Sequence, residues 1–267
     1  MSSSSYETIA YEKSEGVAVI TLNRPEVLNA VNDKMSIELL DALHKAEDDG
    51  EVRCVILTGK GKAFCAGEDI QALRGEYERG EKTNLGERLL KKYNPIVRQI
   101  RRMEKPVIAA VNGVAAGAGA GFAYSCDLRV ASENAKFLQA FIRIGLVPDS
   151  GTSFFLPRLV GFSKATELSL TGDELTSRDA ERFGLVVKVV PQEELMNVAR
   201  ELGRRLASGA TRAIGLTKRA LNKSISSDLE TVLQYESYAQ EIAGSTADHF
   251  EAVKAFFEKR KPAFKGK

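Results

Sequence analysis

The sequence feature that most constrains the fold is an almost wholly apolar run at residues 106–111 (PVIAAV). A strand without alternating polar positions is typical of a parallel sheet, which is covered on both faces. Short runs rich in β-branched residues predict further strands at residues 17–22, 54–58, 127–131 and 186–190. Between them, apolar residues recur at helical spacing, for example from Met35 to Ala46. This alternation predicts an α/β fold.

Beyond Pro191 the pattern is helical only. We expect helices at about residues 193–207, 211–223, 227–243 and 246–259. The chain therefore divides into an α/β core at residues 1–195 and a helical C-terminal region at residues 196–267. A polar stretch at residues 74–86 carries no readable periodicity, and we expect it to be mobile.

Composition excludes several classes of protein. The chain has 38 Lys and Arg against 36 Asp and Glu residues, and a formal charge of +2 predicts no nucleic-acid partner. No apolar stretch approaches the roughly 20 residues of a membrane helix, so no membrane partner is expected. Three cysteines without a Cys-x-x-Cys pair argue against a disulfide framework. The N-terminal residues lack the apolar core of a signal peptide, so we expect a cytoplasmic protein.

Glycines cluster at residues 117–121 (GAGAG), where a predicted strand leads into a helix. Backbone N–H groups at such a turn can bind an anion. One interpretation is a dinucleotide site, but Phe122 replaces the last glycine of that motif. A second is close packing alone, and a third is a set of N–H donors aimed at an oxyanion. The turn at residues 63–70 (AFCAGEDI) also follows a strand and offers a second donor, which favours the third interpretation.

Nucleophilic and metal chemistry lack the histidines they need. Cys65 and Ser150 require a base, yet His44 and His249, the two histidines of the chain, lie in periodic helical patterns. Cys65 is therefore predicted to be a buried thiol. No carboxylate cluster has the spacing of a metal site, and no metal is expected.

Asp149 stands alone among apolar residues such as Phe141, Val147 and Phe154. One interpretation is an N-cap for a helix at residues 150–156, a common local role for aspartate. The other is a single carboxylate in apolar surroundings, which would raise its pKa and suit it to proton transfer. The spacing alone leaves the two equally supported.

Taken together, these motifs resemble the enoyl-CoA hydratase/isomerase (crotonase) superfamily over about residues 6–265. The resemblance rests on ordered matches along the chain, at residues 22–30 (LNRPEVLNA), 63–70 (AFCAGEDI), 105–113 (KPVIAAVNG), 117–119 (GAG), Asp127, 156–161 (LPRLVG), 180–186 and 257–261 (FEKRK).

The resemblance implies a spiral of ββα units whose C-terminal helices form a homotrimer or homohexamer. It implies an acyl-CoA thioester as substrate, with coenzyme A as part of that substrate and no further cofactor. The backbone N–H groups of Glu68 and Ala118, beside Gly117, would hold the thioester oxygen. Phe256 and Lys259 would approach the coenzyme from a neighbouring subunit. The path of the adenine and pantetheine groups would be lined by Val27, Ala30, Ala66, Gly67, Asp69 and Ile70.

The sequence departs from the family's hydratases, which use two glutamates. Gly121 and Phe141 stand at those positions, and Phe141 would instead contact an acyl chain or ring. Asp149 stands where family isomerases and a dehalogenase carry their working aspartate. Residues 139–151 look most like the ring-1,2-epoxyphenylacetyl-CoA isomerases of phenylacetate catabolism. A dehalogenase would need a histidine in this region and a tryptophan, and the chain has no Trp.

We therefore expect an acyl-CoA isomerase in which Asp149 moves a proton through a thioester enolate. One alternative is an enoyl-CoA hydratase of fatty-acid or phenylacetate catabolism that recruits another acid such as Glu68. Alternatives of another class are an RNA-binding module and a non-catalytic oligomer that binds coenzyme A. The acyl group, the pathway and the choice between trimer and hexamer stay open.

Overall fold

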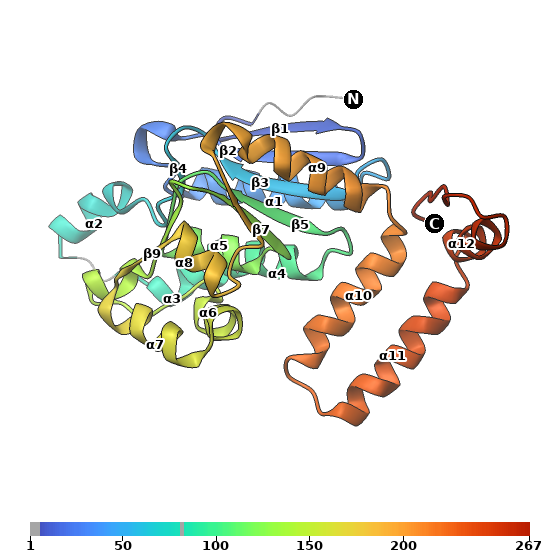
Figure 1. Ribbon diagram of the computed structural model, residues 1–267. Helices are drawn as coiled ribbons and strands as arrows, with labels where there is room; N and C mark the ends of the chain where they lie inside the picture. Colours follow the sequence, from blue (N-terminus) through green and yellow to red (C-terminus); the bar gives the residue numbers. More distant parts are fainter. Residues whose placement is uncertain (1–5, 81–82) are drawn as a thin grey trace.

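Two sheets form the centre of the computed structural model, which describes residues 6–80 and 83–267 (Figure 1). The larger sheet has the order β1-β2-β3-β5-β7-β10, in which β1 is antiparallel to β2 and the other pairs are parallel. Its strands are Ile9–Ser14, Val17–Leu22, Cys54–Gly59, Val107–Val111, Leu128–Ser132 and Lys188–Val190. The smaller sheet, β4-β6-β8-β9, is formed by Ala63–Cys65, Val114–Ala116, Lys136–Leu138 and Glu174–Thr176.

The chain passes between the two sheets in a repeating way. β3, β5 and β7 lie side by side in the larger sheet, and the strand after each of them, β4, β6 and β8, lies in the smaller sheet. The second of these turns ends in helix α5 (Ala118–Ser125). The predicted spiral of ββα units is thereby confirmed, and with it the α/β class.

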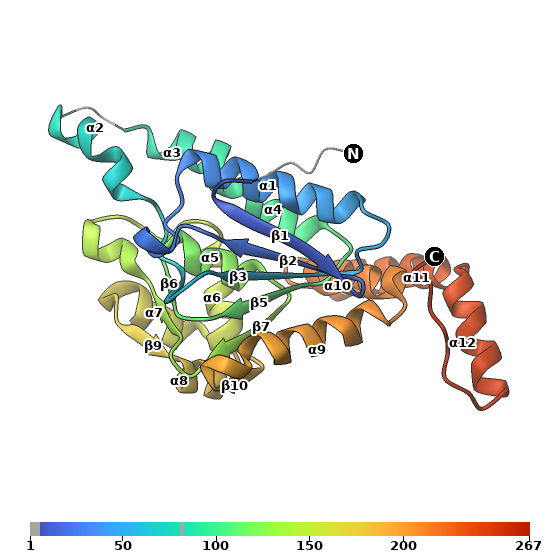
Figure 2. The ribbon, with the colours of Figure 1, turned by 90° about the horizontal axis from the view of Figure 1, so that it is seen from above.

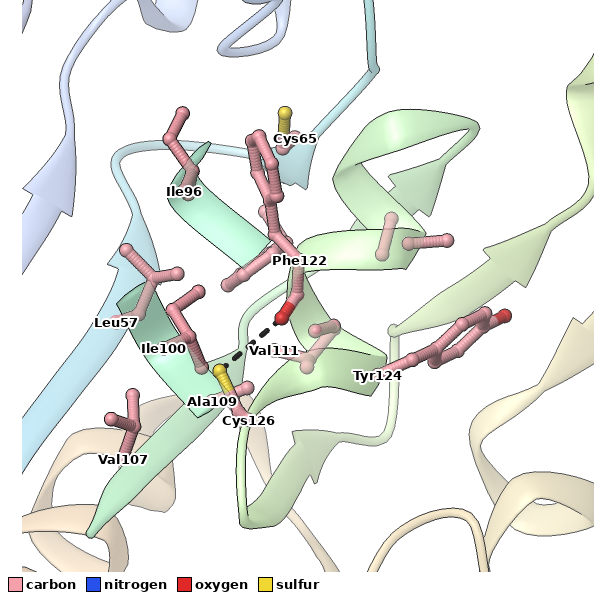
Figure 3. Packing of buried hydrophobic residues seen from close by; sticks show 14 of the residues in the cluster. Leu57, Cys65, Ile96, Ile100, Val107, Ala109, Val111, Phe122, Tyr124 and Cys126 are labelled. Carbon is pink, nitrogen blue, oxygen red and sulfur yellow. Dashed lines mark hydrogen bonds between the residues drawn. The ribbon is translucent and has the colours of Figure 1, made fainter. Parts of the chain in front are cut away.

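Helices cover both faces of the larger sheet, as the apolar run of β5 requires (Figure 2). On one face lie α1 (Asp33–Asp48), which the Asn32 side chain caps, and α4 (Asn94–Arg102) together with α5. Figure 3 shows Phe122 of α5 pointing toward Cys65, with Ile96 and Ile100 of α4 beside it. On the other face α9 (Leu195–Ala207) packs against the sheet.

Further helices, most of them short, connect the strands of the two sheets. η2 (Ile70–Leu73) and α2 (Arg74–Glu78) follow the turn after β4, so residues 74–78 of the stretch expected to be mobile are helical. Residues 81 and 82 of that stretch lie outside the described residues. The remaining connections are η1 (Pro25–Val27), α3 (Leu85–Arg88), η3 (Leu89–Tyr93), η4 (Ala140–Ile144), α6 (Thr152–Val160), α7 (Phe162–Thr171), α8 (Ser177–Arg182) and η5 (Gln192–Glu194).

The last three helices project from the body of the protein (Figures 1 and 2). They are α10 (Thr211–Ser224), α11 (Leu229–Gly244) and α12 (Ala247–Phe257). The buried Lys218 ammonium ties α10 to the core, 2.7 Å from the Asp127 carboxylate and 2.8 Å from the Ile100 carbonyl oxygen. The division predicted at residue 195 falls at the start of α9, which packs on the sheet. None of the described helices has the length and apolarity needed to span a membrane.

Candidate active site

Two backbone segments meet where β4 and β6 end. Gly119 lets α5 approach β4, because a Cβ at this position would lie 2.3 Å from the Cys65 carbonyl oxygen. Gly67 has φ of +91°, and a Cβ there would lie 3.0 Å from the Ala116 carbonyl oxygen and 3.4 Å from the Ala118 nitrogen. Since only glycine allows both approaches without strain, these two glycines bring the Glu68 and Ala118 segments together.

The backbone N–H groups of Glu68 and Ala118 are left without a partner in the described part of the chain. Residue 68 forms a parallel bridge with Val31, in which the Gly67 carbonyl accepts from Val31 and the Asp69 N–H donates to it. The N–H of Glu68 itself therefore points away from Val31. Ala118 is the first residue of α5, where N–H groups have no acceptor within the helix. Gly117, at φ of +51°, supplies the turn before it.

The Asp149 carboxyl group lies half-buried beside this pair of segments. Burial raises its pKa, the Ser150 hydroxyl opposes that shift by donating at 2.7 Å, and the nearby charge of Glu68 raises the pKa again. Among the described residues no cation forms an ion pair with Asp149. The interpretation as an N-cap is wrong, because α6 begins at Thr152 after a left-handed Gly151 and no side chain caps it. The Thr152 N–H instead bonds the backbone carbonyl of Asp149, at 2.8 Å.

Of the two positions matched to the glutamates of the hydratases, Gly121 has no room for a longer side chain, and Phe141 fills the other with a ring that cannot exchange a proton. A Cβ on Gly121 would lie 2.7 Å from both the Cβ and the carbonyl oxygen of Ser150. Phe141 is only 6% exposed, and its ring packs 3.8 Å from the position of a Cβ on Gly117. The segment that carries Asp149 therefore occupies the space beside Gly121.

The Glu68 side chain is held by three donors, which the sequence reasoning did not predict. Lys92 donates at 2.7 Å and Arg88 at 3.0 Å to one carboxylate oxygen, and the Tyr93 hydroxyl donates to the other. Asp33 lies next to the two cations, 3.2 Å from Lys92 and 3.3 Å from Arg88. The i, i+4 spacing of Arg88 and Lys92 was the available signal, but it does not reveal their partner.

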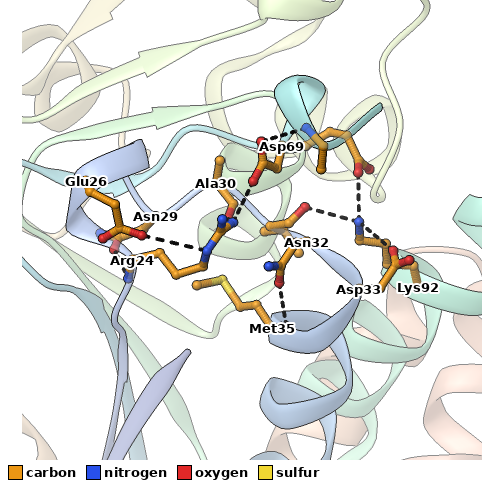
Figure 4. Close-up of polar contacts among 12 residues, drawn as sticks. Arg24, Glu26, Asn29, Ala30, Asn32, Asp33, Met35, Asp69 and Lys92 are labelled. Carbon is orange, nitrogen blue, oxygen red and sulfur yellow. Dashed lines mark hydrogen bonds and ion pairs between the residues drawn. The ribbon is translucent and has the colours of Figure 1, made fainter. Parts of the chain in front are cut away.

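Asp69 turns into the protein rather than outward. Its carboxylate binds the Arg24 guanidinium at 2.8 Å and the Ala72 N–H at 3.2 Å, and Arg24 also donates to the Ala30 carbonyl (Figure 4). This pair joins the loop around Val27 to the turn after β4. The other predicted lining residues are Ala30, which is buried, Val27 and Ala66, which are half-buried, and Ile70, which is exposed.

Phe256 and Lys259 do not reach this site within one chain. Phe256 is exposed at the end of α12, and Lys259 follows it with φ of +53°. In Figure 1, α12 lies at the opposite end of the molecule from α2 and α3.

The cysteines and metal ligands can also be placed. Cys65 is buried, and burial raises its pKa to about 12, so a neutral thiol results at physiological pH. The His, Cys, Asp and Glu side chains of the described residues form no group of three that could hold a metal ion.

Comparison with known proteins identifies the family. Residues 12–267 match the family described as enoyl-CoA hydratase/isomerase. The chain is 43% identical to the 1,2-epoxyphenylacetyl-CoA isomerase of Escherichia coli, over 98% of this chain and 99% of that protein. It is 42% identical to the short-chain-enoyl-CoA hydratase of Clostridium acetobutylicum, over 95% of each. The crystal structure of an enoyl-CoA hydratase from Bacillus anthracis superposes with a TM-score of 0.90 at 34% identity, over 98% of this chain and 100% of that one. The chain therefore belongs to the enoyl-CoA hydratase/isomerase family of enzymes, the crotonase superfamily.

Proposed function

We propose that this protein is an acyl-CoA isomerase that moves a double bond, or rearranges a ring, next to a thioester. The Asp149 carboxylate takes a proton from the α-carbon of the acyl chain, and the electron pair of that C–H bond passes into a thioester enolate. The carboxylic acid then returns the proton to the γ-carbon, so the product has the composition of the substrate. The N–H groups of Glu68 and Ala118 hold the enolate oxygen, each contributing on the order of 3 kcal/mol.

The observation that carries this proposal is the setting of Asp149. A half-buried carboxyl group with a raised pKa and no ion-pair partner among the described residues suits proton transfer near neutral pH. It lies close enough to Glu68 for that residue's charge to act on it. These features support Asp149 as the base that acts beside the two N–H donors.

Hydration of a double bond would need groups to hold and activate water. Gly121 and Phe141 have no proton to exchange, and the approach of Ser150 to Gly121 leaves no space for a longer side chain. The relative from Escherichia coli is named an isomerase, and the match covers almost all of both chains.

We further propose that the substrate is a coenzyme A thioester and that the active protein is a homotrimer or homohexamer. The loop around Val27 and the turn after β4, which the Arg24–Asp69 pair joins, would line the coenzyme path. No other cofactor or metal is proposed. Large apolar side chains on the projecting helices are exposed, which is typical of a surface that another subunit covers. They are Leu229, Leu233, Phe250, Phe256 and Phe257.

Replacing Asp149 by Asn tests the proposed function. We expect migration of the double bond in a 3-enoyl-CoA to fall by at least about 100-fold, the usual contribution of a positioned acid or base. Asp173→Asn is a matched control, because Asp173 is an exposed carboxylate on the connection between α7 and β9. Unimpaired turnover in Asp149→Asn would refute the proposal.

A hydratase is the second candidate, since the relative from Clostridium acetobutylicum is named one. Mass spectrometry of the products separates the two. An isomerase leaves the mass of an enoyl-CoA unchanged, whereas a hydratase adds one water to a 2-enoyl-CoA. A hydrated product that persists in Asp149→Asn would favour the hydratase.

A further inference from the structure

We propose that the Glu68 side chain is a positioning group whose clamp, formed by Arg88, Lys92 and Tyr93, fixes the oxyanion N–H of the same residue and holds its carboxylate near Asp149. The proposal rests on the function proposed above. It joins two parts of the chain, the turn after β4 and the helix at residues 85–102, that the sequence does not connect.

The clamp depends on an irregular turn of that helix. η3 is a π-helical turn in which the Asn94 N–H donates to the Leu89 carbonyl, five residues earlier. In a regular α-helix successive residues are rotated by about 100°, so Arg88 and Tyr93, which are five residues apart, would lie about 140° apart around the helix axis. The wider turn brings Arg88 and Tyr93 to one face, and all three donors reach one carboxylate. Turns of this kind are rare in proteins, and those that do occur often lie at functional sites.

By binding the Glu68 carboxylate, the clamp also holds the backbone of Glu68 in place. Lys92 is buried, and besides Glu68 it donates to the Val31 carbonyl oxygen at 3.1 Å. Val31 is the residue that bridges Glu68 on the backbone. Lys92 therefore binds both sides of the bridge that sets the direction of the Glu68 N–H. Figure 4 shows Lys92 in this position beside Asp33.

The same carboxylate acts on Asp149. The groups around Asp149 are the Ser150 hydroxyl on its own turn, Glu68 on the turn after β4, and the phenol of Tyr93 on η3. Lys92, Arg88 and Asp33 surround Glu68, Cys65 lies near Tyr93, and Arg101 of α4 stacks on Phe155 further along α6. Among the described residues, Glu68 is thus the charged side chain that acts on Asp149, and its negative charge raises the pKa of that carboxyl.

The test uses the full-length protein and three variants, Lys92→Met, Tyr93→Phe and Glu68→Gln, with Lys91→Met as the matched control. Lys91 is the preceding residue, exposed and paired with Glu87 at 2.5 Å. The first measurement is the fraction of bound acetoacetyl-CoA present as its enolate, read by ultraviolet absorbance. This fraction reports the oxyanion site without requiring turnover. We expect the enolate equilibrium to fall by about tenfold in Lys92→Met and Tyr93→Phe, the effect of losing one strong hydrogen bond.

The second measurement is the pH dependence of kcat/KM for isomerisation. We expect the acid limb to move to lower pH in Glu68→Gln, because a negative charge beside Asp149 is removed. A purely structural loss would lower the rate at all pH values without moving this limb. Tyr93→Phe keeps the ring that packs 6.0 Å from Phe122, so it remains informative if the other variants fold poorly.

The outcomes separate this inference from the proposed function. If Lys92→Met and Tyr93→Phe behave like Lys91→Met, or if the acid limb stays in place in Glu68→Gln, the clamp is refuted while isomerisation still stands. If the wild-type protein isomerises no 3-enoyl-CoA but its enolate signal falls in the clamp variants, the proposed function is refuted and the clamp on the oxyanion site stands. An enolate signal absent from the wild-type protein would overturn both.

Discussion

Gly119→Ala should move apart the Glu68 and Ala118 segments, whose N–H groups form the proposed oxyanion site. The structure defines how far they must move. The new Cβ would lie 2.3 Å from the Cys65 carbonyl oxygen and 2.7 Å from the Cys65 Cβ. Ordinary contacts begin at 3.4 Å, so α5 and β4 must move apart by about 1.1 Å. A misplacement of about 1 Å can cost 100-fold in rate, and overpacking of this size costs about 1–3 kcal/mol of stability.

The assay is kcat/KM for isomerisation of a 3-enoyl-CoA, measured together with thermal unfolding. Gly50→Ala is the control, because a Cβ at residue 50 meets no atom within 4 Å and its backbone is not left-handed. We expect Gly119→Ala to lose about 100-fold in kcat/KM while remaining folded at the assay temperature. A folded Gly119→Ala protein with the kcat/KM of the wild type would refute the claim that this close approach sets the position of the N–H donors.

Three further predictions follow from buried groups. Because the folded state raises the pKa of Asp149, its charge destabilises the protein above that pKa; Asp149→Asn should therefore melt higher than the wild type at neutral pH, with the difference disappearing as the pH falls below the unfolded value of about 3.9. An equal difference at all pH values would contradict this. Lys218→Met should lower the free energy of unfolding in urea by about 3 kcal/mol, because it leaves the Asp127 carboxylate without its buried partner; an unchanged midpoint would argue against the ion pair. The three thiols should resist a thiol reagent until the protein is denatured, since burial raises the pKa of Cys65 to about 12; rapid labelling of the native protein would count against it.

The strands of the larger sheet were predictable because buried strands consist of local runs of apolar residues. The apolar run at residues 106–111 predicts a strand covered on both faces, and β5 is buried at every position. The C-terminal helices were predictable for a similar reason, since their spacing repeats over several turns. α10 and α12 begin and end within two residues of the expected positions.

The arrangement of the site could be predicted only in part. Whether Asp149 caps a helix depends on where α6 begins, and a left-handed Gly151 moves that start to Thr152. The clamp on Glu68 depends on a single π-helical turn, which leaves no pattern in the sequence. The lack of space at Gly121 depends on Ser150, which is distant in the chain and meets it only in the fold.

A crystal structure with bound acetoacetyl-CoA is the most direct test of the isomerase mechanism. We predict a carboxylate oxygen of Asp149 within about 3.5 Å of the carbons at positions 2 to 4 of the acyl group, the distance of a reactive approach. The thioester oxygen should lie within hydrogen-bond distance of the Glu68 and Ala118 nitrogens. A carboxyl group of Asp149 that faces solvent, with another ionisable side chain nearer those carbons, would contradict the mechanism.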